Sequence, residues 1–108
     1  EEKPFIVTGS PGGSQIITTV FQVIVNIIDH KMTVYDATLA KRIHHQWMPD
    51  QLRVEQGINP RAKRLLLNKG YNIREVVSMG VAQSIIIKNN EKQGAADMRR
   101  ISSRAIGY

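Results

Sequence analysis

The sequence Gly-Ser-Pro-Gly-Gly-Ser at residues 9–14 holds the arrangement best suited to chemistry. It joins a short apolar run at residues 4–8 to a long segment with helical periodicity that opens at Gln15. Glycine has no Cβ, so the backbone at Gly12 and Gly13 can approach a ligand closely, and the first N–H groups of a helix lack intrahelical partners. The helix dipole also favours negative charge at that end. The turn therefore predicts a site for a carboxylate or for an oxyanion that develops during a reaction.

Known phosphate-binding loops differ from this turn. A Walker loop requires Lys and then Ser or Thr after its last glycine, whereas Gly13 is followed by Ser14 and Gln15, and the GxGxxG spacing is also absent. Nucleotide binding is therefore disfavoured. An ordinary strand-to-helix turn with Ser14 as N-cap is the other interpretation, and the pattern alone leaves it open.

The adjacent pair His44 and His45 is the second place where residue types suggest chemistry. Successive side chains of a strand point to opposite faces, and no second pair of His, Asp or Glu stands at a ligand spacing. We expect no metal site, with one histidine hydrogen-bonded in the core and the other facing solvent or a neighbouring chain. Trp47 could stack on a ligand, although a lone Trp more often anchors packing. The sequence has no Cys, which excludes a thiol nucleophile and thiolate ligands, and nothing in it indicates a cofactor.

The long segment at residues 15–29 is predicted to be an amphipathic helix that positions the glycine turn. Its apolar side chains recur at spacings of three and four, and their number predicts burial beneath a sheet. The apolar positions are Ile16, Ile17, Val20, Phe21, Ile24, Ile27 and Ile28, widened by Val23 and Val25. A short second helix is predicted at residues 34–42, with Thr33 as its N-cap.

A third helix is predicted between Asn59 and Gly70. Asn59 suits the N-cap, Pro60 suits the first helical position, and Gly70 suits the position just after the helix. The three leucines at residues 65–67 are expected on its buried side.

Extended segments are predicted on both sides of this third helix. They are residues 4–8, 43–50 with a bend at Pro49-Asp50, 51–55, 72–78 and 82–88, the last followed by a turn at residues 89–91. The tail at residues 94–108 has the composition of turns, with Asp97 and nearby Arg residues as a candidate local ion pair. Helices and strands alternate around one predicted sheet, so we expect a single domain over residues 1–108 with an α+β or layered α/β architecture.

The formal net charge of +6 is unevenly distributed. Residues 1–50 hold four Lys or Arg against five Asp or Glu, giving −1, whereas residues 51–108 hold eleven against four, giving +7. These basic residues are scattered over several predicted elements with little aromatic interleaving, and no nucleic-acid reader motif accompanies them. We therefore expect solvated faces and no nucleic-acid partner.

The sequence also bears on membranes and export. No apolar run approaches the roughly 18–20 residues that cross a bilayer, so no membrane span is expected. Glu1-Glu2-Lys3 does not have the pattern of a signal-peptide start. If the protein is exported, its signal is expected on a longer precursor.

Three sequence blocks together resemble the γ-glutamyltranspeptidase, or glutathione hydrolase, family. They are Val-Thr-Gly-Ser-Pro-Gly-Gly-Ser at residues 7–14 continuing to Thr19, Arg-Ile-His-His-Gln-Trp-Met-Pro-Asp at residues 42–50, and Gly-Ala-Ala-Asp at residues 94–97 with a Gly-Tyr terminus. Their order and spacing are similar, over the length of the chain, to the C-terminal part of that family's small subunit.

The resemblance implies an N-terminal-nucleophile hydrolase with an αββα sandwich, made as a precursor that cleaves itself into a large and a small subunit. It implies transfer of the γ-glutamyl group of glutathione and related γ-glutamyl compounds to water or to amino-acid or peptide acceptors, without a cofactor, in a periplasmic or extracellular enzyme. The family's nucleophile is the small subunit's N-terminal Thr, whose α-amine acts as the base. Gly12 and Gly13 match the positions whose N–H groups form the family's oxyanion hole, in agreement with the interpretation of the turn itself.

Several of the family's working residues have no counterpart in the sequence given. They are the catalytic Thr, the residues that hold the γ-glutamyl amine, the paired Ser, and the large subunit's carboxylate-binding Arg. Thr8, Thr18 and Thr19 cannot replace the nucleophile, because the mechanism requires Thr at a free N-terminus. Met98 stands where the family's Asp-Pro-Arg has Pro. We therefore expect the lone chain to lack activity.

Two hypotheses from different classes follow. In the first, the chain is a piece of a γ-glutamyl-transferring enzyme, supplies Gly12 and Gly13 to the oxyanion hole, and binds the large subunit and the rest of the small subunit. In the second, it is a non-catalytic binding or scaffold domain, a relic of the enzyme whose Gly-Gly turn holds a carboxylate and whose basic second half contacts an acidic partner. A Thr-bearing cleavage site upstream would favour the first.

Overall fold

The computed structural model describes residues 5–100 of the 108-residue chain. The chain divides into two compact units, and we describe each by itself. The first unit comprises Glu1–Ala40 and Gly80–Tyr108, and the second comprises Lys41–Met79. The second unit is thus an insertion between two halves of the first.

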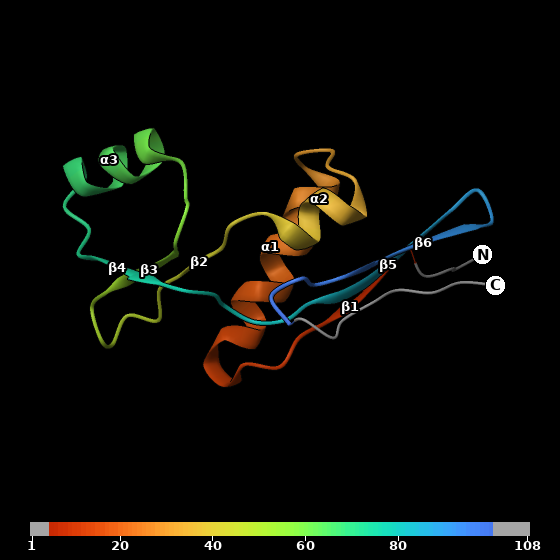
Figure 1. Cartoon of the computed structure of the whole chain (residues 1–108), viewed down its shortest axis with the longest axis horizontal. Coiled ribbons are helices and arrows are strands. Elements are labelled where there is room, and N and C mark those ends of the chain that lie inside the picture. The colour runs from red at the N-terminus through yellow and green to blue at the C-terminus, as the bar shows by residue number, and fades with distance from the viewer. Residues whose placement is uncertain (1–4, 101–108) are drawn as a thin grey trace. The chain divides into compact units, whose positions relative to one another are not determined.

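A three-stranded antiparallel sheet and two helices form the described part of the first unit (Figure 1). Its elements are β1 (Ile6–Gly9), the single 3-10 turn η1 (Gly13–Gln15), α1 (Ile16–Ile28), α2 (Val34–Leu39), β5 (Gln83–Lys88) and β6 (Glu91–Ala96). The strand order is β1-β5-β6, so β5 lies in the centre although it is separated from β1 by most of the chain. The core of this unit joins both helices to β5 and β6, and consists of Val23, Ile27, Val34, Ala37, Ala82, Ile86 and Ala95.

Helix α1 confirms the predicted helix at residues 15–29 within two residues of its ends. Thr19, Val23 and Ile27 are buried at a spacing of four, which places them on one stripe of the helix against the sheet. The apolar pattern is wider than this stripe. Ile17 and Phe21 lie 81% and 63% exposed, so α1 presents a second apolar face that the described residues do not cover.

Helix α2 is shorter than predicted. Thr33 caps it as expected, because its hydroxyl accepts a hydrogen bond from the Asp36 N–H at 3.0 Å. The helix ends at Leu39 rather than at residue 42, since Ala40 is already extended with ψ 144°. The Arg99 guanidinium donates to the Ala40 carbonyl at 2.9 Å and so satisfies the backbone where the helix stops.

The second unit has its own three-stranded sheet. Its elements are β2 (Ile43–His44), β3 (Leu52–Glu55), α3 (Pro60–Asn68) and β4 (Ile73–Val76). Strand β2 pairs antiparallel with β3, and β3 pairs parallel with β4 through a crossover that contains α3. The prediction of one sheet is therefore wrong, because β3 and β4 pair with each other inside the insertion rather than with β1 or β5. The expected strand at residues 43–50 is also wrong beyond His44, because residues 45–51 form an irregular loop.

Helix α3 has the predicted ends but not the predicted burial. The Asn59 side chain accepts from the Arg61 and Ala62 N–H groups, Pro60 is the first helical residue, and Gly70 adopts φ +92° just beyond the end. None of its residues is buried, and Leu65 and Leu67 are 53% and 50% exposed, so the expected buried side of leucines is wrong for the described chain. Three consecutive leucines span most of a helical turn and cannot all face one side.

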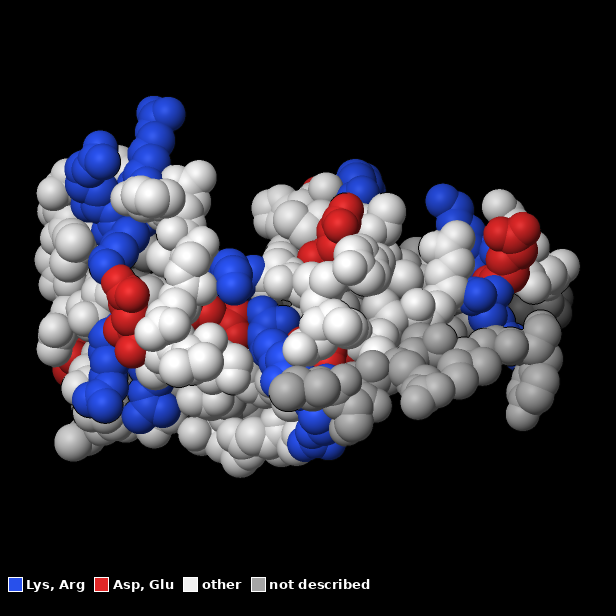
Figure 2. All heavy atoms as spheres, viewed as in Figure 1, with Lys and Arg blue, Asp and Glu red and all other residues white. Residues whose placement is uncertain are grey.

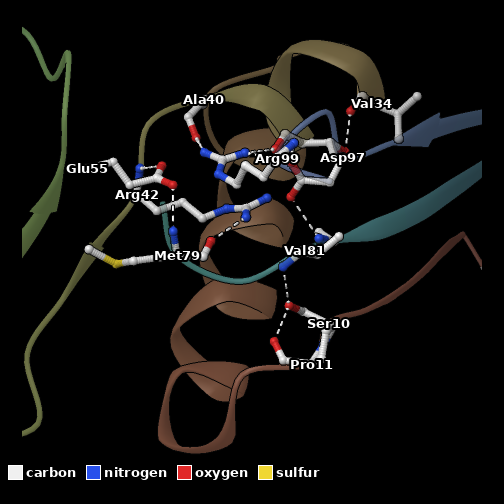
Figure 3. A network of polar contacts seen from close by, with 12 residues as sticks. Ser10, Pro11, Val34, Ala40, Arg42, Glu55, Met79, Val81, Asp97 and Arg99 are labelled. Atoms are coloured by element: carbon white, nitrogen blue, oxygen red, sulfur yellow. Dashed lines mark hydrogen bonds and ion pairs between the residues drawn. The ribbon is translucent and has the colours of Figure 1, made fainter. Parts of the chain in front are cut away.

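A buried carboxylate fixes the two ends of the second unit (Figure 3). Glu55 is 1% exposed, and its two oxygens accept from the Arg42 N–H at 2.8 Å and the Met79 N–H at 2.7 Å. The Arg42 guanidinium donates in turn to the Met79 carbonyl at 2.7 Å. Because Arg42 and Met79 lie beside the two points where the chain enters and leaves this unit, Glu55 holds those points together.

The last described strand corrects the prediction for the tail. Residues 91–96 form β6, which pairs with β5 in a hairpin rather than forming turns. The turn between them is tight, with Asn89 at φ 52° and Asn90 at φ 66°, which are values that asparagine tolerates and that suit a two-residue hairpin. The Gly-Tyr terminus and the rest of residues 101–108 lie outside the described residues.

Most of the basic excess belongs to the second unit, which carries eight Lys or Arg against three Asp or Glu. Lys and Arg side chains gather over α3 (Figure 2). The helix exposes Arg61 and Arg64, while Lys63 contacts Glu75 of β4. Among the described residues, no helix is both long enough and apolar enough to cross a membrane.

Candidate functional site

The glycine turn at residues 9–13 is an exposed loop that ends in two adjacent backbone donors. Gly12 and Gly13 adopt φ values of 137° and 57°, which L side chains rarely take. Both residues are exposed, and within residues 5–100 neither N–H donates to a protein acceptor. The turn therefore leaves two unused donors at the start of η1 and α1, where the helix dipole favours an anion.

Ser14 does not have the structural role that the alternative interpretation gave it. It lies inside the 3-10 turn η1, whose N-cap is Gly12, and Gln15 precedes α1. No side-chain capping hydrogen bond is present at either position. The interpretation of Ser14 as the N-cap is therefore wrong for the described chain.

The turn is attached to the start of β5 by a hydroxyl. Ser10 Oγ accepts from the Val81 N–H at 2.9 Å and donates to the Pro11 carbonyl at 2.7 Å. Next to it, the β1–β5 ladder pairs Gly9 with Gln83, which fixes the strand end from which the turn leaves. The position of the two glycines thus depends on residues far away in sequence.

The segment after Gly80 is fixed in turn by a buried carboxylate (Figure 3). Asp97 is fully buried, and its Oδ2 accepts from the Ala82 N–H at 2.8 Å. Its Oδ1 accepts from the Arg99 N–H and from Arg99 Nη1, both at 3.0 Å, and Arg99 Nη1 also donates to the Thr38 carbonyl. This confirms the predicted ion pair of Asp97. Because the Asp97 carboxylate accepts from the N–H two residues further on, it also holds this turn, although Met98 stands where the resemblance implies Pro.

In the histidine loop of the second unit, residues 44–50, polar side chains form hydrogen bonds with other residues of the same loop. His44 is buried and its Nε2 lies 2.9 Å from Gln46 Oε1, while His45 is exposed, as the sequence predicted for one core and one solvent-facing histidine. His45 Nδ1 accepts from the Trp47 N–H at 3.0 Å and its Nε2 lies 3.2 Å from Asp50 Oδ1. Trp47 is 77% exposed, so the expectation that it anchors packing is wrong for the described chain.

The described residues offer little other chemistry near the turn. They contain no group of three or more His, Cys, Asp or Glu placed to hold a metal ion. A cavity of about 420 Å³ opens near the other end of α1, lined by Phe5, Ile27, Ile28, Lys31, Met32, Thr33, Ile86, Lys88 and Gln93, and it does not include the glycines.

This geometry suits stabilisation of negative charge rather than nucleophilic attack. Two adjacent N–H groups in a glycine turn can hold a carboxylate or a developing oxyanion. The hydroxyls nearby are engaged: Thr8 Oγ1 lies 2.8 Å from Ser84 Oγ, and Thr19 is 1% exposed. The sequence interpretation gave no role to Gly80, whose only signal was an isolated glycine between two predicted strands.

Comparison with known proteins places the chain among longer enzymes. A family model described as gamma-glutamyltranspeptidase matches residues 1–107. The glutathione hydrolase proenzyme of Escherichia coli (strain K12) is 49% identical over 107 residues, which are 98% of this chain and 18% of that protein. The glutathione hydrolase proenzyme of Pseudomonas sp. (strain A14) is 32% identical over 117 residues, covering 98% of this chain and 20% of that protein. The chain thus spans about a fifth of the length of these relatives.

Solved structures agree with the sequence comparison. An acivicin-inhibited gamma-glutamyltranspeptidase matches with a TM-score of 0.85 at 42% identity, over 89% of this chain and 54% of that chain. The gamma-glutamyltranspeptidase of Pseudomonas nitroreducens complexed with L-DON matches with a TM-score of 0.84 at 30% identity, over 96% of this chain and 54% of that chain.

Proposed function

Since this chain belongs to the γ-glutamyltranspeptidase family, we propose that it forms part of an enzyme that hydrolyses glutathione and transfers its γ-glutamyl group, and that Gly12 and Gly13 supply the oxyanion hole. Its α+β fold is the corresponding part of an N-terminal-nucleophile hydrolase. The observation that carries the proposal is the exposed turn in which both glycine N–H groups lack protein acceptors within the described residues.

The proposed role follows from the chemistry of acyl transfer. A hydroxyl nucleophile gives its proton to a base and attacks the γ-glutamyl carbonyl carbon, which breaks the C=O π bond and leaves negative charge on the carbonyl oxygen. Two N–H donors held in place stabilise this oxyanion more than they stabilise the neutral carbonyl, which lowers the barrier. When the intermediate collapses, the C–N bond breaks and the leaving amine takes a proton from the protonated base. The resulting ester is then cleaved by water or by an amino-acid or peptide acceptor.

The nucleophile and base of this reaction are assigned to another part of the precursor. We propose that they are an N-terminal Thr and its own α-amine, as the family resemblance implies, because the hydroxyls near the turn are engaged or buried. The partners are then a large subunit and the remaining segment of the small subunit. The proposed reaction needs no cofactor, and we place the enzyme in the periplasm or outside the cell on the same resemblance.

A chimaera tests this function. The aligned 107 residues of the E. coli glutathione hydrolase proenzyme are replaced by this chain, and turnover of a chromogenic γ-glutamyl anilide is measured for the chimaera and for the isolated chain. We expect the chimaera to release the anilide and the isolated chain to stay at the buffer rate, because it has no activated nucleophile. Turnover by the pure chain, or a chimaera that matures and folds but is inactive, would contradict the proposal.

A further inference from the structure

Gly80 lies where a side chain would collide with its neighbours. Its φ of +66° lies in the left-handed region, and a Cβ placed on it would lie 2.6 Å from Thr19 Oγ1 and 2.8 Å from Ser10 Oγ. Contacts this short do not occur for real Cβ atoms, so any side chain at this position must push its neighbours apart. Position 80 is therefore restricted both by backbone conformation and by space.

The neighbours of Gly80 connect directly to the two glycines of the turn. Ser10 leads through Pro11 to Gly12, and a Cβ on Gly12 would lie 3.9 Å from Gly80 Cα, so the two backbones are in contact. On its other side, Gly80 meets Thr19, which is buried in α1 and has little freedom to move. A side chain at position 80 can be relieved most easily by displacing the exposed turn rather than the packed helix.

The Ser10 hydroxyl adds a specific link across this contact. It accepts from the Val81 N–H at 2.9 Å and donates to the Pro11 carbonyl at 2.7 Å, so one side chain joins the segment after Gly80 to the backbone next to Gly12. The Val81 side of the link is well anchored. Ala82 donates to the buried Asp97 carboxylate at 2.8 Å and leads into β5, which pairs with β1.

We propose that Gly80 and Ser10 are positioning residues that set the direction of the Gly12 and Gly13 N–H groups toward the reacting carbonyl oxygen. This inference rests on the oxyanion-hole role proposed for that turn. Neither residue touches substrate in this scheme: Gly80 permits close approach, and Ser10 holds the turn at the distance that results. A displacement of about 1 Å in a catalytic group can cost about 10²-fold in rate, so a small shift of the turn has a large effect.

The test compares Gly80→Ala, Ser10→Ala and Ser10→Thr in the E. coli chimaera, with Gly70→Ala as the matched control. Gly70 also has a positive φ, of +92°, but its Cβ would meet nothing within 4 Å and it lies in the second unit. We expect kcat per cleaved enzyme to fall about 10²-fold for Gly80→Ala and less for Ser10→Ala, with KM for the γ-glutamyl anilide little changed. Ser10→Thr keeps the hydroxyl and should recover most of the rate, while Gly70→Ala should lower only the thermal midpoint.

Crystal structures of the same variants separate this inference from the proposed function, because they do not depend on turnover. Gly80→Ala should move the Gly12 and Gly13 nitrogens by more than the roughly 0.5 Å that a functional group tolerates. If Gly80→Ala yields no cleaved enzyme, Ser10→Ala, which adds no atoms, carries the same test. An unmoved turn in both variants, or a fall in thermal midpoint with kcat unchanged, would overturn the positioning role. A moved turn in a chimaera that has no activity even before substitution would support positioning and count against the proposed function instead.

Discussion

The glycine turn of the first unit and the histidine loop of the second unit differ in how far their polar groups are hydrogen-bonded, and their residue types alone do not reveal this difference. The loop at residues 44–50 carries two imidazoles, an amide and a carboxylate. However, the His45 ring contacts the Trp47 N–H and the Asp50 carboxylate, and the Gln46 amide donates to the Met48 carbonyl. In the turn, the Ser10 hydroxyl is hydrogen-bonded to Val81 and Pro11, but the backbone N–H groups of Gly12 and Gly13 have no acceptor within residues 5–100. Hydrogen-bond accounting, rather than the list of reactive side chains, therefore separates a candidate site from a self-contained loop.

The largest effect is expected from a substitution that distorts the glycine turn. Gly13→Val places a β-branched side chain at φ +57°, a region that such residues avoid, so the backbone must shift and one N–H leaves its position. We expect kcat of the chimaera to fall about 10²–10³-fold, or roughly 3–4 kcal/mol in barrier, which is typical for loss of one oxyanion donor. Steady-state kinetics with the γ-glutamyl anilide measure this directly.

Gly13→Ala is the control for that variant, because a Cβ on Gly13 meets nothing within 4 Å. Its backbone strain in the left-handed region is about 1 kcal/mol, so it should retain more activity than Gly13→Val. Equal rates for both variants and the parent would show that the Gly13 N–H does not act on the transition state.

A second change tests whether the buried polar group of the second unit is structural. Glu55→Ala leaves the buried N–H groups of Arg42 and Met79 without the acceptor that they have now. Each unsatisfied buried donor costs about 1–3 kcal/mol, so the free energy of unfolding should fall by a few kcal/mol and the thermal midpoint with it. Differential scanning calorimetry of the chimaera measures the shift.

Glu75→Ala is the matched control for Glu55→Ala. Glu75 is a partly exposed carboxylate on β4 that pairs with Lys63, and surface pairs contribute about 0–1 kcal/mol. A Glu55→Ala protein as stable as the Glu75→Ala protein would contradict the structural role of Glu55.

A third change concerns the exposed apolar face of α1. In the isolated chain, Ile17 and Phe21 lie 81% and 63% exposed, and large exposed apolar patches usually acquire a partner. We expect the isolated chain to self-associate or to unfold with weak cooperativity, and Ile17→Ser combined with Phe21→Ser to reduce the association. Sedimentation velocity distinguishes these cases, and a clean monomer with a sharp thermal transition before substitution would count against the expectation.

The smallest effect is expected in the histidine loop. His45→Ala removes the acceptor of the Trp47 N–H and the contact to Asp50, both on an exposed loop. We expect a loss of about 1 kcal/mol in stability and little change in kcat of the folded enzyme. A His45→Ala chimaera that folds normally but does not turn over would reverse the comparison between the two regions.

Local sequence signals predicted those features of the fold that depend on neighbouring residues. The glycine turn, the helix α1 and the ends of α3 at Asn59 and Gly70 were predicted because each depends on residues within a few positions. The buried stripe of α1 was not predicted, because it contains Thr19 and leaves the apolar Ile17 and Phe21 exposed. Pairing was not predicted, since the parallel contact between β3 and β4 and the hairpin of β6 depend on partners that periodicity does not identify.

At the candidate site, too, the local feature could be predicted from the sequence and the long-range contact could not. The turn at Gly12 and Gly13 has a local signature, so the sequence located it. The contact of Gly80 with Ser10 and Thr19 joins residues more than sixty positions apart, and an isolated glycine gives no sign of such a partner. The sequence was therefore enough to locate the turn, whereas its contact with Gly80 came from the structure alone.

The most direct measurement is a crystal structure of the chimaera with a γ-glutamyl boronate, whose tetrahedral adduct imitates the charged intermediate. The Gly12 and Gly13 nitrogens should each lie about 2.7–3.1 Å from the boronate oxygen that stands for the carbonyl oxygen. The assignment of these two N–H groups as the oxyanion hole would be contradicted if other groups bound this oxygen and the Gly12 and Gly13 N–H groups pointed away from it.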